Sequence, residues 1–439
     1  MNKQEKKELR QQTACQWLSE NYLQFEHLRH DIVTDRLQIL DYNLTPDLKE
    51  EAAQWRNLTD KDINTMVCNC VEETQVNVTV SEMWTALKSD RIPAVHPLRA
   101  WLQELRPYTE DRPDWIDMVA QQVVVKDDGL LAMGDGQAYW RACFKKWFVA
   151  MVASWMKDEV VNHTVLVLVG RQGIFKTTWL DSLIPPALRA YSSKLPLSGQ
   201  ISKDDRLRLC ENGMLNIDEL DAICGREMNI VKSLLTSTVV NERAAYGRLK
   251  ERRLRLASFC ASTNNREFLT DITGNRRWLP FEVESIQNPF HTTLPYELMY
   301  AEALYLIEND FNYWFDIEEI AALETHNELF RAQDNEEQLL PILFDIPAEG
   351  RGEFMTTAEI SELLVTYGNI KKPLNTRQLG MLMTKKGFQN KKVSISGVSL
   401  RGWMVYKRDL DEIKRVKKNG HLDNLTTNIK NSHPYVREV

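Results

Sequence analysis

The feature that most constrains this chain is an apolar run that ends in a glycine and continues as a helical pattern. Residues 165–169 read VLVLV, the length of one buried strand, and the run breaks at Gly170. A helical pattern that includes Trp179 and Leu180 begins after Gly173. Strand, glycine turn and helix in this order bring backbone N–H groups and the positive end of a helix dipole to one point. We therefore predict an α/β fold whose sheet is built around this turn.

The side chains of the turn predict that it binds the phosphates of ATP. Lys176 adds a positive charge, and the hydroxyl of Thr177 is placed to bind Mg²⁺. The spacing G-x-x-x-x-G-K-T is met except at its second glycine, where Phe175 stands and its Cβ can crowd the loop. An ordinary turn with an incidental surface lysine is the alternative. The residues expected to contact ATP and Mg²⁺ are Gly170, Gln172, Gly173, Lys176, Thr177 and Thr178.

Two later apolar runs are predicted to add polar groups to the same edge of the sheet. The run GMLNIDELD ends on Asp218 and Glu219, and acids at the end of a parallel strand lie beside a phosphate turn. We predict that Asp218 holds Mg²⁺ and that Glu219 accepts a proton from the attacking water. A strand that simply ends in an acidic turn is the alternative. Asn264 ends the next buried run, where it is predicted to orient a water against the γ-phosphate.

A basic passage precedes the run that ends at Asn264. Residues 232–255 contain seven Lys or Arg against two Glu, with a tyrosine among them. Basic residues interleaved with an aromatic one suit a nucleic-acid backbone, although a solvated hairpin has the same composition. The candidate nucleic-acid contacts are Arg243, Tyr246, Arg248 and Lys250.

Two arginines stand just before another predicted strand. Arg276 and Arg277 lie in the sequence TGNRRWLPF. Paired arginines at this point are predicted to neutralise charge on the transferring phosphoryl group, either in cis or across a subunit boundary. The alternative is that they pair with local acids such as Asp271 and pin the loop.

Charge is distributed unevenly along the chain. The net charge is −7, but residues 351–439 hold 17 Lys or Arg and 8 Asp or Glu, which is +9 and leaves −16 for the remainder. Residues 286–350 hold 14 acidic residues and one basic residue. This switch predicts a domain boundary near position 350 and a C-terminus that binds a polyanion, with a solvated basic face as the alternative.

The chain is predicted to divide into five parts. They are an N-terminal α+β region (1–93), an ATPase core with a helical lead-in (94–285), an acidic helical linker or lid (286–349), a basic winged-helix-like domain (350–410) and a basic tail (411–439). Within the core, residues 137–157 form a helical pattern with an aromatic stripe, which we interpret as buried core. In the C-terminal part, the segments TTAEISELL, TRQLGMLMTKKGF and SISGVSLRGWMVYK predict two helices and a two-strand wing.

Several protein classes are disfavoured by what the sequence lacks. No apolar run approaches the ~18 residues of a membrane span, and the first residues have no signal-peptide pattern, so a cytoplasmic location without membrane contact is expected. The seven cysteines are scattered without zinc-ligand spacing and are expected to be reduced. Neither H-x-x-x-H nor G-x-S-x-G occurs, which gives no support to metal hydrolysis or serine chemistry.

The phosphate turn, IDELD, STNN and TGNRRWLPF, in this order, resemble the virulence-associated protein E family of P-loop ATPases. That family is related to superfamily III helicases and to the helicase half of phage and plasmid primase–helicases. The resemblance covers residues 94–283 and implies an AAA+-like P-loop core. It further implies that Lys176 and Thr177 are the phosphate-loop pair, Asp218 and Glu219 the acidic pair, Asn264 the sensor, and Arg276 or Arg277 the arginine finger.

These features together predict an ATP-hydrolysing motor that acts on single- or double-stranded DNA during replication of a phage or mobile element. The expected assembly is a homo-oligomeric ring, a hexamer, and a separate primase is an expected partner because no primase signature is evident upstream. One alternative is a nucleotide-regulated DNA-binding protein with little or no hydrolysis. The reason for this alternative is Phe175, which replaces the second glycine of the phosphate-loop spacing. A small-molecule phosphotransferase is a third, but the sequence carries no sign of an acceptor site.

Overall fold

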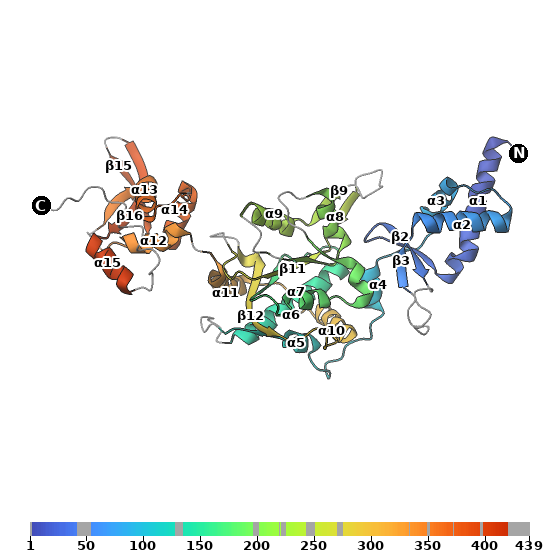
Figure 1. Cartoon of the computed structure of the whole chain (residues 1–439), viewed down its shortest axis with the longest axis horizontal. Helices are drawn as coiled ribbons and strands as arrows, with labels where there is room; N and C mark the ends of the chain where they lie inside the picture. The colour runs from blue at the N-terminus through green and yellow to red at the C-terminus, as the bar shows by residue number, and fades with distance from the viewer. Residues whose placement is uncertain are drawn as a thin grey trace. The chain divides into compact units, whose positions relative to one another are not determined.

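The structure is a computed structural model with a mixed α/β fold. It describes residues 2–41, 54–127, 135–195, 202–218, 220, 225–242, 251–269, 275–332, 334–348, 352–371, 373–395 and 398–419. Contacts between residues divide the chain into two compact units (Figure 1). The first unit comprises Met1–Arg266 and Arg276–Asn327, and the second comprises Glu267–Asn275 and Glu328–Val439.

The first unit is built on a six-stranded sheet with the order β5-β12-β6-β11-β8-β7. Each neighbouring pair from β12 to β7 runs parallel, and β5 pairs antiparallel with β12 at the edge. The central strand β6 is the VLVLV run, and all five of its residues are buried, as expected for a strand covered on both faces. The strands are β5 (Val123–Val125), β6 (Val165–Val169), β7 (Ser192–Lys194), β8 (Met214–Ile217), β11 (Ser258–Thr263) and β12 (Trp278–Ile286).

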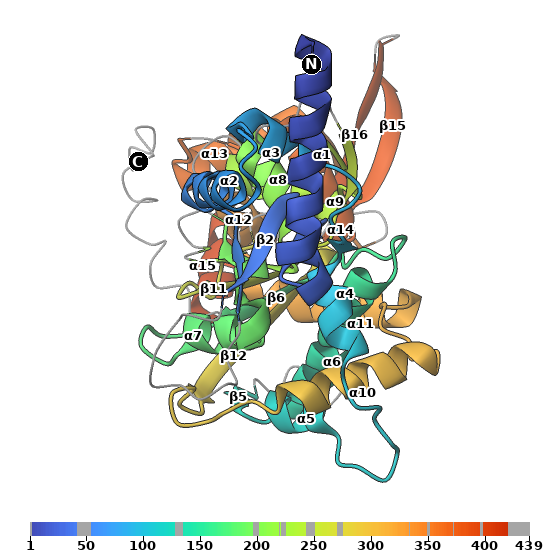
Figure 2. The same cartoon turned by 90° about the vertical axis from the view of Figure 1, so that its right-hand side faces the viewer.

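Helices cover both faces of this sheet. Helices α6 and α10 lie on one side of β6 and β11, and α8 and α9 lie on the other (Figure 1, Figure 2). The helices of this core are α4 (Pro97–Gln103), α5 (Trp115–Ala120), α6 (Gly136–Met156), α7 (Lys176–Ser182), α8 (Lys203–Glu211), α9 (Gly225–Thr236), α10 (Tyr296–Glu308) and α11 (Ile317–Asn327), with 3₁₀ turns η2 (Pro186–Tyr191) and η4 (Asn275–Arg277). A two-stranded hairpin joins α9 to β11 and consists of β9 (Val239–Glu242) and β10 (Glu251–Leu254).

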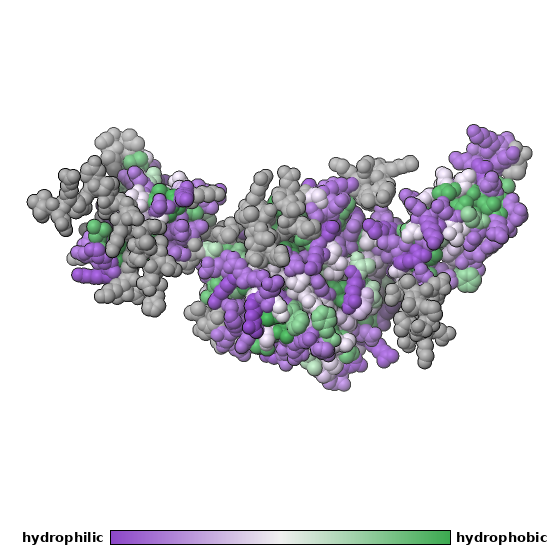
Figure 3. Space-filling model, in the orientation of Figure 1, coloured by the Kyte–Doolittle hydropathy of each residue, from purple (hydrophilic) through white to green (hydrophobic). Residues whose placement is uncertain are grey.

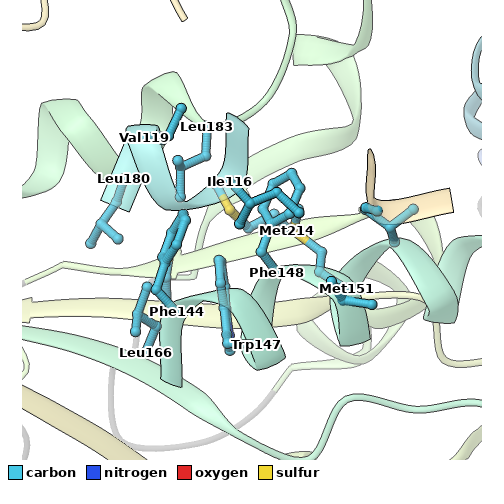
Figure 4. Packing of buried hydrophobic residues seen from close by; sticks show 14 of the residues in the cluster. Ile116, Val119, Phe144, Trp147, Phe148, Met151, Leu166, Leu180, Leu183 and Met214 are labelled. Atoms are coloured by element: carbon cyan, nitrogen blue, oxygen red, sulfur yellow. The ribbon is translucent and has the colours of Figure 1, made fainter. Parts of the chain in front are cut away.

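Helix α6, the longest helix of the core, has Asp135 as its N-cap residue. The Asp135 side chain accepts hydrogen bonds from the backbone N–H groups of Gln137 and Ala138. Its aromatic residues pack against β6 and α7, where Figure 4 shows Phe144 and Trp147 beside Leu166 and Leu180. The interpretation of the aromatic stripe as core is confirmed, because Trp140, Phe144, Trp147, Phe148, Met151 and Trp155 are all fully buried.

The N-terminal part of the first unit has its own small core and sheet. The sheet order is β3-β2-β1-β4, and helices α1 to α3 pack together beside it. The buried carboxylate of Asp31 accepts a hydrogen bond of 2.9 Å from the hydroxyl of Tyr191, which joins this sheet to the core. The elements are α1 (Lys3–Asn21), η1 (Leu23–Phe25), β1 (Leu28–Asp31), β2 (Arg36–Asp41), β3 (Gln54–Asn57), α2 (Asp60–Thr74), α3 (Val80–Leu87) and β4 (Ala94–Val95).

The second unit packs helices against a small antiparallel sheet. Strand β16 is central, because β13, β14 and β15 all pair with it. Helices α13 and α14 each begin at a capping box, formed by Thr356 with Glu359 and by Asn375 with Gln378. The elements are η5 (Glu328–Phe330), α12 (Asn335–Leu343), β13 (Phe344–Asp345), β14 (Glu353–Thr356), α13 (Thr357–Gly368), α14 (Thr376–Lys385), β15 (Gln389–Ile395), β16 (Val398–Lys407) and α15 (Leu410–Asn419).

The surface carries no sign of a membrane-spanning segment among the described residues, where no helix combines the length and the apolar character that crossing a bilayer requires. On the face shown in Figure 3, hydrophilic residues cover most of the described surface and hydrophobic ones form small patches.

Candidate functional site

The turn between β6 and α7 has an unusual backbone. Gly173 and Phe175 have positive φ angles, +85° and +67°, whereas Ile174 between them does not. Alternation of this kind produces a concave row of N–H groups that suits an anion. The N–H groups of residues 172–175 donate no hydrogen bond to any residue that the structure describes. The turn therefore offers four consecutive unused donors.

Two residues of the turn are explained by close contacts. A Cβ at Gly170 would lie 3.0 Å from the carbonyl oxygen of Val283, so a larger residue would displace the neighbouring strand. Phe175 has a left-handed backbone conformation that usually favours glycine, and its ring packs edge to face on Phe290 at 6.2 Å. This contact supplies a reason for a phenylalanine at a position where the spacing predicts glycine.

The amine of Lys176 lies at the mouth of the turn and is held by neighbouring oxygens. The Nζ atom donates to the carbonyls of Gly170 at 2.7 Å and Arg171 at 2.8 Å, and to the side-chain oxygen of Asn264 at 3.1 Å. Only 7% of Lys176 is exposed. Because β11 lies next to β6, the residue that follows β11 comes to the start of α7, and the structure brings Asn264 to Lys176.

Asp218 follows β8 and lies beside the first turn of α7. Its Oδ1 atom accepts hydrogen bonds of 3.1 Å from the hydroxyls of Thr177 and Ser262, and these two hydroxyls lie 2.9 Å apart. Its Oδ2 atom accepts a hydrogen bond of 2.7 Å from Lys194. Burial raises the pKa of the Asp218 carboxyl, but the hydrogen bonds from Lys194, Ser262 and Thr177 outweigh burial and hold that pKa below its ordinary value.

These oxygens fit a divalent cation. Mg²⁺ prefers oxygen ligands and binds through one or two protein groups together with substrate phosphates. The hydroxyl of Thr177 and the ionised carboxylate of Asp218 supply two such oxygens within 3.1 Å of one another, beside the unused N–H groups of the turn. The residues present therefore fit an Mg²⁺–nucleotide.

Two residues of this cluster are not among the sequence-based candidates. Ser262 lies two positions before Asn264, and a hydroxyl near the end of a strand predicted to be buried was the available signal. Lys194 ends β7, and nothing in the local sequence marks it. It reaches Asp218 because β7 and β8 are parallel, with Lys194 paired in register with Asn216.

Two sequence-based candidates, Arg276 and Arg277, lie away from this cluster. Arg276 is exposed and Arg277 half-buried, and both precede β12. Because β12 is parallel to β6 and Trp278 pairs with Val165, the two arginines lie at the edge of the sheet opposite the turn. Gln172, Gly173 and Thr178 belong to the turn and to α7. The remaining candidates, Glu219, Arg243, Tyr246, Arg248 and Lys250, lie outside the described residues.

Comparisons with solved structures give only distant similarity. The apo structure of the NrS-1 C-terminal region in its A form aligns at 12% identity with a TM-score of 0.42, covering 89% of this chain and 98% of that chain. A second apo structure of the same region aligns at 11% identity with a TM-score of 0.43, covering 87% and 97%. A search of curated proteins found no match.

A family model matches part of the chain. Residues 121–332 match the model of the virulence-associated protein E-like domain. The matched segment contains the turn, Asp218, Asn264 and both arginines. The resemblance predicted from the sequence over residues 94–283 is confirmed where the two ranges overlap, from residue 121 to residue 283, and this part of the chain is similar to the virulence-associated protein E-like domain.

Proposed function

We propose that this protein is a P-loop ATPase of the AAA+-like type that hydrolyses Mg²⁺–ATP to act on DNA during replication of a phage or mobile element. The family match supports the biological setting. The observation that carries the proposal is the meeting of Lys176 with Asn264, and of Thr177 with Asp218, at the carboxyl ends of three parallel strands. This edge is where open α/β sheets bind their ligands.

In this proposal each group has a distinct task. The unused N–H groups of the turn and the amine of Lys176 would hold the β- and γ-phosphates. Thr177 and Asp218 would hold Mg²⁺, which when bound withdraws charge from the phosphate oxygens. Asn264 already contacts the amine that would touch the γ-phosphate, and is therefore close enough to orient the attacking water. Glu219 remains the predicted proton acceptor.

A ring of subunits accounts for the arginines at the opposite edge. Within one chain, the five residues of β6 separate Arg277 from the turn by about 16 Å, which is beyond the reach of one arginine side chain. We therefore favour action in trans, in which Arg276 or Arg277 reaches the nucleotide of a neighbouring subunit. A hexamer is the ring size that we expect.

One observation favours a second candidate, a nucleotide-regulated DNA-binding protein with little hydrolysis. Phe175 has a backbone conformation that costs a residue other than glycine on the order of 1 kcal/mol. The Phe175–Phe290 contact then holds the turn in one shape, which would suit binding better than turnover.

ATP hydrolysis with and without single-stranded DNA tests the proposal. We expect turnover that DNA stimulates, and a loss of about 100-fold in nucleotide affinity or turnover in Lys176→Ala, because the charged hydrogen bonds to phosphate are lost. Lys203→Ala is the matched control, since Lys203 is exposed at the start of α8. Binding without hydrolysis would favour the second candidate. Full turnover in Lys176→Ala would refute the assignment of the site.

A further inference from the structure

The second unit contains a long segment with cations and no acids. Residues 363–408 hold ten Lys or Arg and no Asp or Glu. The described part of this segment forms α14, β15 and β16 together with the end of α13. Three of its cations pair with acids from outside the segment: Lys385 with Glu328, Lys386 with Glu337, and Arg408 with Asp345.

The exposed cations of the segment that make no ion pair with any acid that the structure describes are Lys371, Arg377, Lys391, Lys392, Arg401 and Lys407. Three of them, Arg377, Lys392 and Arg401, are the subject of the proposal below. Lys392 and Arg401 also lie directly opposite one another on the antiparallel pair β15–β16. Like charges at directly opposite positions destabilise a strand pair, so folding does not explain this arrangement. A bound polyanion would convert it into a favourable one.

These cations lie on the side of the sheet that carries α14. Arg401 and Trp403 are two residues apart on β16 and therefore share a face of the sheet. Helix α14 packs on that face, because a Cβ at Gly380 would lie 3.8 Å from the Trp403 ring. Lys392 shares the face because it is paired with Arg401. We call Arg377, Lys392 and Arg401 the basic surface.

Helix α14 presents a polar side to solvent. Leu379, Leu382 and Met383 are buried against the core of the second unit. At 100° per residue, Arg377 and Thr384 point away from these three residues, and both are exposed. A helix with side chains is about 10–12 Å across, which matches the width of about 12 Å of the DNA major groove.

The aromatic residues of the segment favour duplex over single-stranded DNA. Single-stranded DNA binds by stacking its bases on exposed aromatic side chains. In the described residues from 363 to 408, Phe388 and Trp403 are buried, the half-buried Tyr367 packs against the core of the second unit, and the half-buried Tyr406 bonds through its hydroxyl to Glu412 at 3.1 Å. This part of the segment therefore offers no open aromatic ring on which a base could stack.

We propose that residues 352–419 bind double-stranded DNA, with α14 in the major groove and with Lys392 and Arg401 on the phosphates beside it. The proposal is supported by the order of α12, β14, α13, α14, β15 and β16, in which a helix is followed by a pair of antiparallel strands, as a recognition helix is followed by the wing in a winged helix-turn-helix. The proposal names the DNA structure that the protein prefers, and it holds whether or not the first unit hydrolyses ATP.

The test measures binding of the full chain to a labelled duplex, to one of its single strands and to an RNA duplex of the same sequence, without nucleotide. We expect the DNA duplex to bind at least about tenfold tighter than the single strand, because only the duplex offers a groove for α14. The RNA duplex should bind more weakly than the DNA duplex, because its major groove is too narrow for a side chain to read.

Two variants of neighbouring lysines localise the contact. Lys392→Ser should weaken duplex binding and reduce the slope of log affinity against log salt by about 0.9, the value for one phosphate contact. Lys391→Ser is the matched control, because Lys391 is an equally charged, exposed residue of the same strand on the opposite face of the sheet. It should change the slope much less.

Several outcomes would overturn the proposal. They are single-stranded DNA binding as tightly as the duplex, the RNA duplex binding as tightly as the DNA duplex, or equal effects of the two lysine variants. Repeating the measurement in Lys176→Ala protein separates this proposal from the ATPase: duplex binding should persist there even if nucleotide binding is lost.

Discussion

The charged side chains of two regions differ in how they are paired. One region is the site at the β6–α7 turn, which we call the turn site and which contains Lys176, Thr177, Asp218 and Asn264; the other is the basic surface of the second unit. In the turn site, Lys176 is held by three oxygens and Asp218 by Lys194 and two hydroxyls, all within 3.1 Å. On the basic surface, Lys392 and Arg401 face one another without an acid partner in the described residues. The turn site is organised before its ligand arrives, whereas the basic surface becomes favourable only when a ligand neutralises it. The first should therefore resist salt and the second should depend on it.

The largest effect is expected from removing the arginine that, in the proposed ring, would reach the turn site of a neighbouring subunit. We expect Arg276→Ala or Arg277→Ala to lower ATP turnover by about 10³-fold or more, the effect of losing an arginine finger. Mixing the inactive arginine variant with inactive Lys176→Ala protein should restore turnover, because some interfaces then combine an intact turn with an intact arginine. The readout is the ATPase rate against mixing ratio. Full activity of both arginine variants, or of a demonstrably monomeric sample, would refute both the arginine finger that acts in trans and the ring assembly.

A second change removes the acid of the turn site. Asp218→Asn should lower Mg²⁺-dependent turnover by about 100-fold, because an amide replaces a carboxylate as metal ligand. Turnover and binding of a fluorescent ATP analogue are measured against Mg²⁺ concentration. Asp204→Asn, in the exposed first turn of α8, is the control. If Asp218→Asn keeps its Mg²⁺ dependence, Asp218 is not a metal ligand.

The salt dependence of ligand binding can be compared directly between the two regions. With three phosphate contacts, a fourfold rise in salt should weaken duplex binding about 40-fold. Nucleotide binding should change by less than about threefold, because the amine of Lys176 is buried among fixed dipoles and is screened little. Fluorescence anisotropy of both ligands over the same salt series provides the comparison. Parallel losses would mean that the two regions do not differ as described.

Lys194 is a cation already present at Asp218, the proposed metal ligand. Its side chain is 57% exposed, so its ion pair with Asp218 contributes about 0–1 kcal/mol. In Lys194→Met, Mg²⁺ no longer competes with the ammonium, and half-maximal nucleotide binding should need about two- to fivefold less Mg²⁺. Lys194→Arg should behave like the wild type, and Lys203→Met is the control for loss of one charge. A higher Mg²⁺ requirement would show that Lys194 assists the metal instead.

The same pair has a consequence for pH. Burial raises the pKa of Asp218, and the hydrogen bonds from Lys194, Ser262 and Thr177 lower it by more. A carboxyl whose pKa is depressed in the folded state contributes stability above its unfolded pKa, and this contribution is lost as the pH falls through the folded pKa. Removing Lys194 removes one of the hydrogen bonds that lower the pKa of Asp218, so the carboxyl should be protonated at a higher pH and should then no longer bind Mg²⁺. In Lys194→Met, Mg²⁺-dependent nucleotide binding should therefore fail at a higher pH during acidification than in the wild type. Titration of binding from neutral to acidic pH measures the difference.

The smallest expected effect concerns Phe175. Phe175→Gly relieves the left-handed conformation but loses the contact with Phe290, and these terms are each on the order of 1 kcal/mol. Turnover should be unchanged or raised up to a few-fold, because no phosphate contact is removed. Phe290→Ala loses only the contact and isolates that term. A large loss of turnover in Phe175→Gly would show that the ring shapes a working turn.

The sequence alone determined those parts of the site that depend on local order along the chain. The apolar run at 165–169 ends on Gly170, and the strands at 214–217 and 258–263 are each followed by a polar residue. A parallel sheet then brings Lys176, Asp218 and Asn264 to one edge. The aromatic stripe of α6 was likewise readable, because helical spacing places its members on the buried side.

The tertiary structure alone decided which neighbours these groups have. Lys194 contacts Asp218 because β7 and β8 pair in one register, and Ser262 joins them because β11 lies between β6 and β8. The opposition of Lys392 and Arg401 likewise depends on the register of β15 and β16. Strand order and register follow from the packing of the whole sheet, and a shift of one residue would move each side chain to the other face.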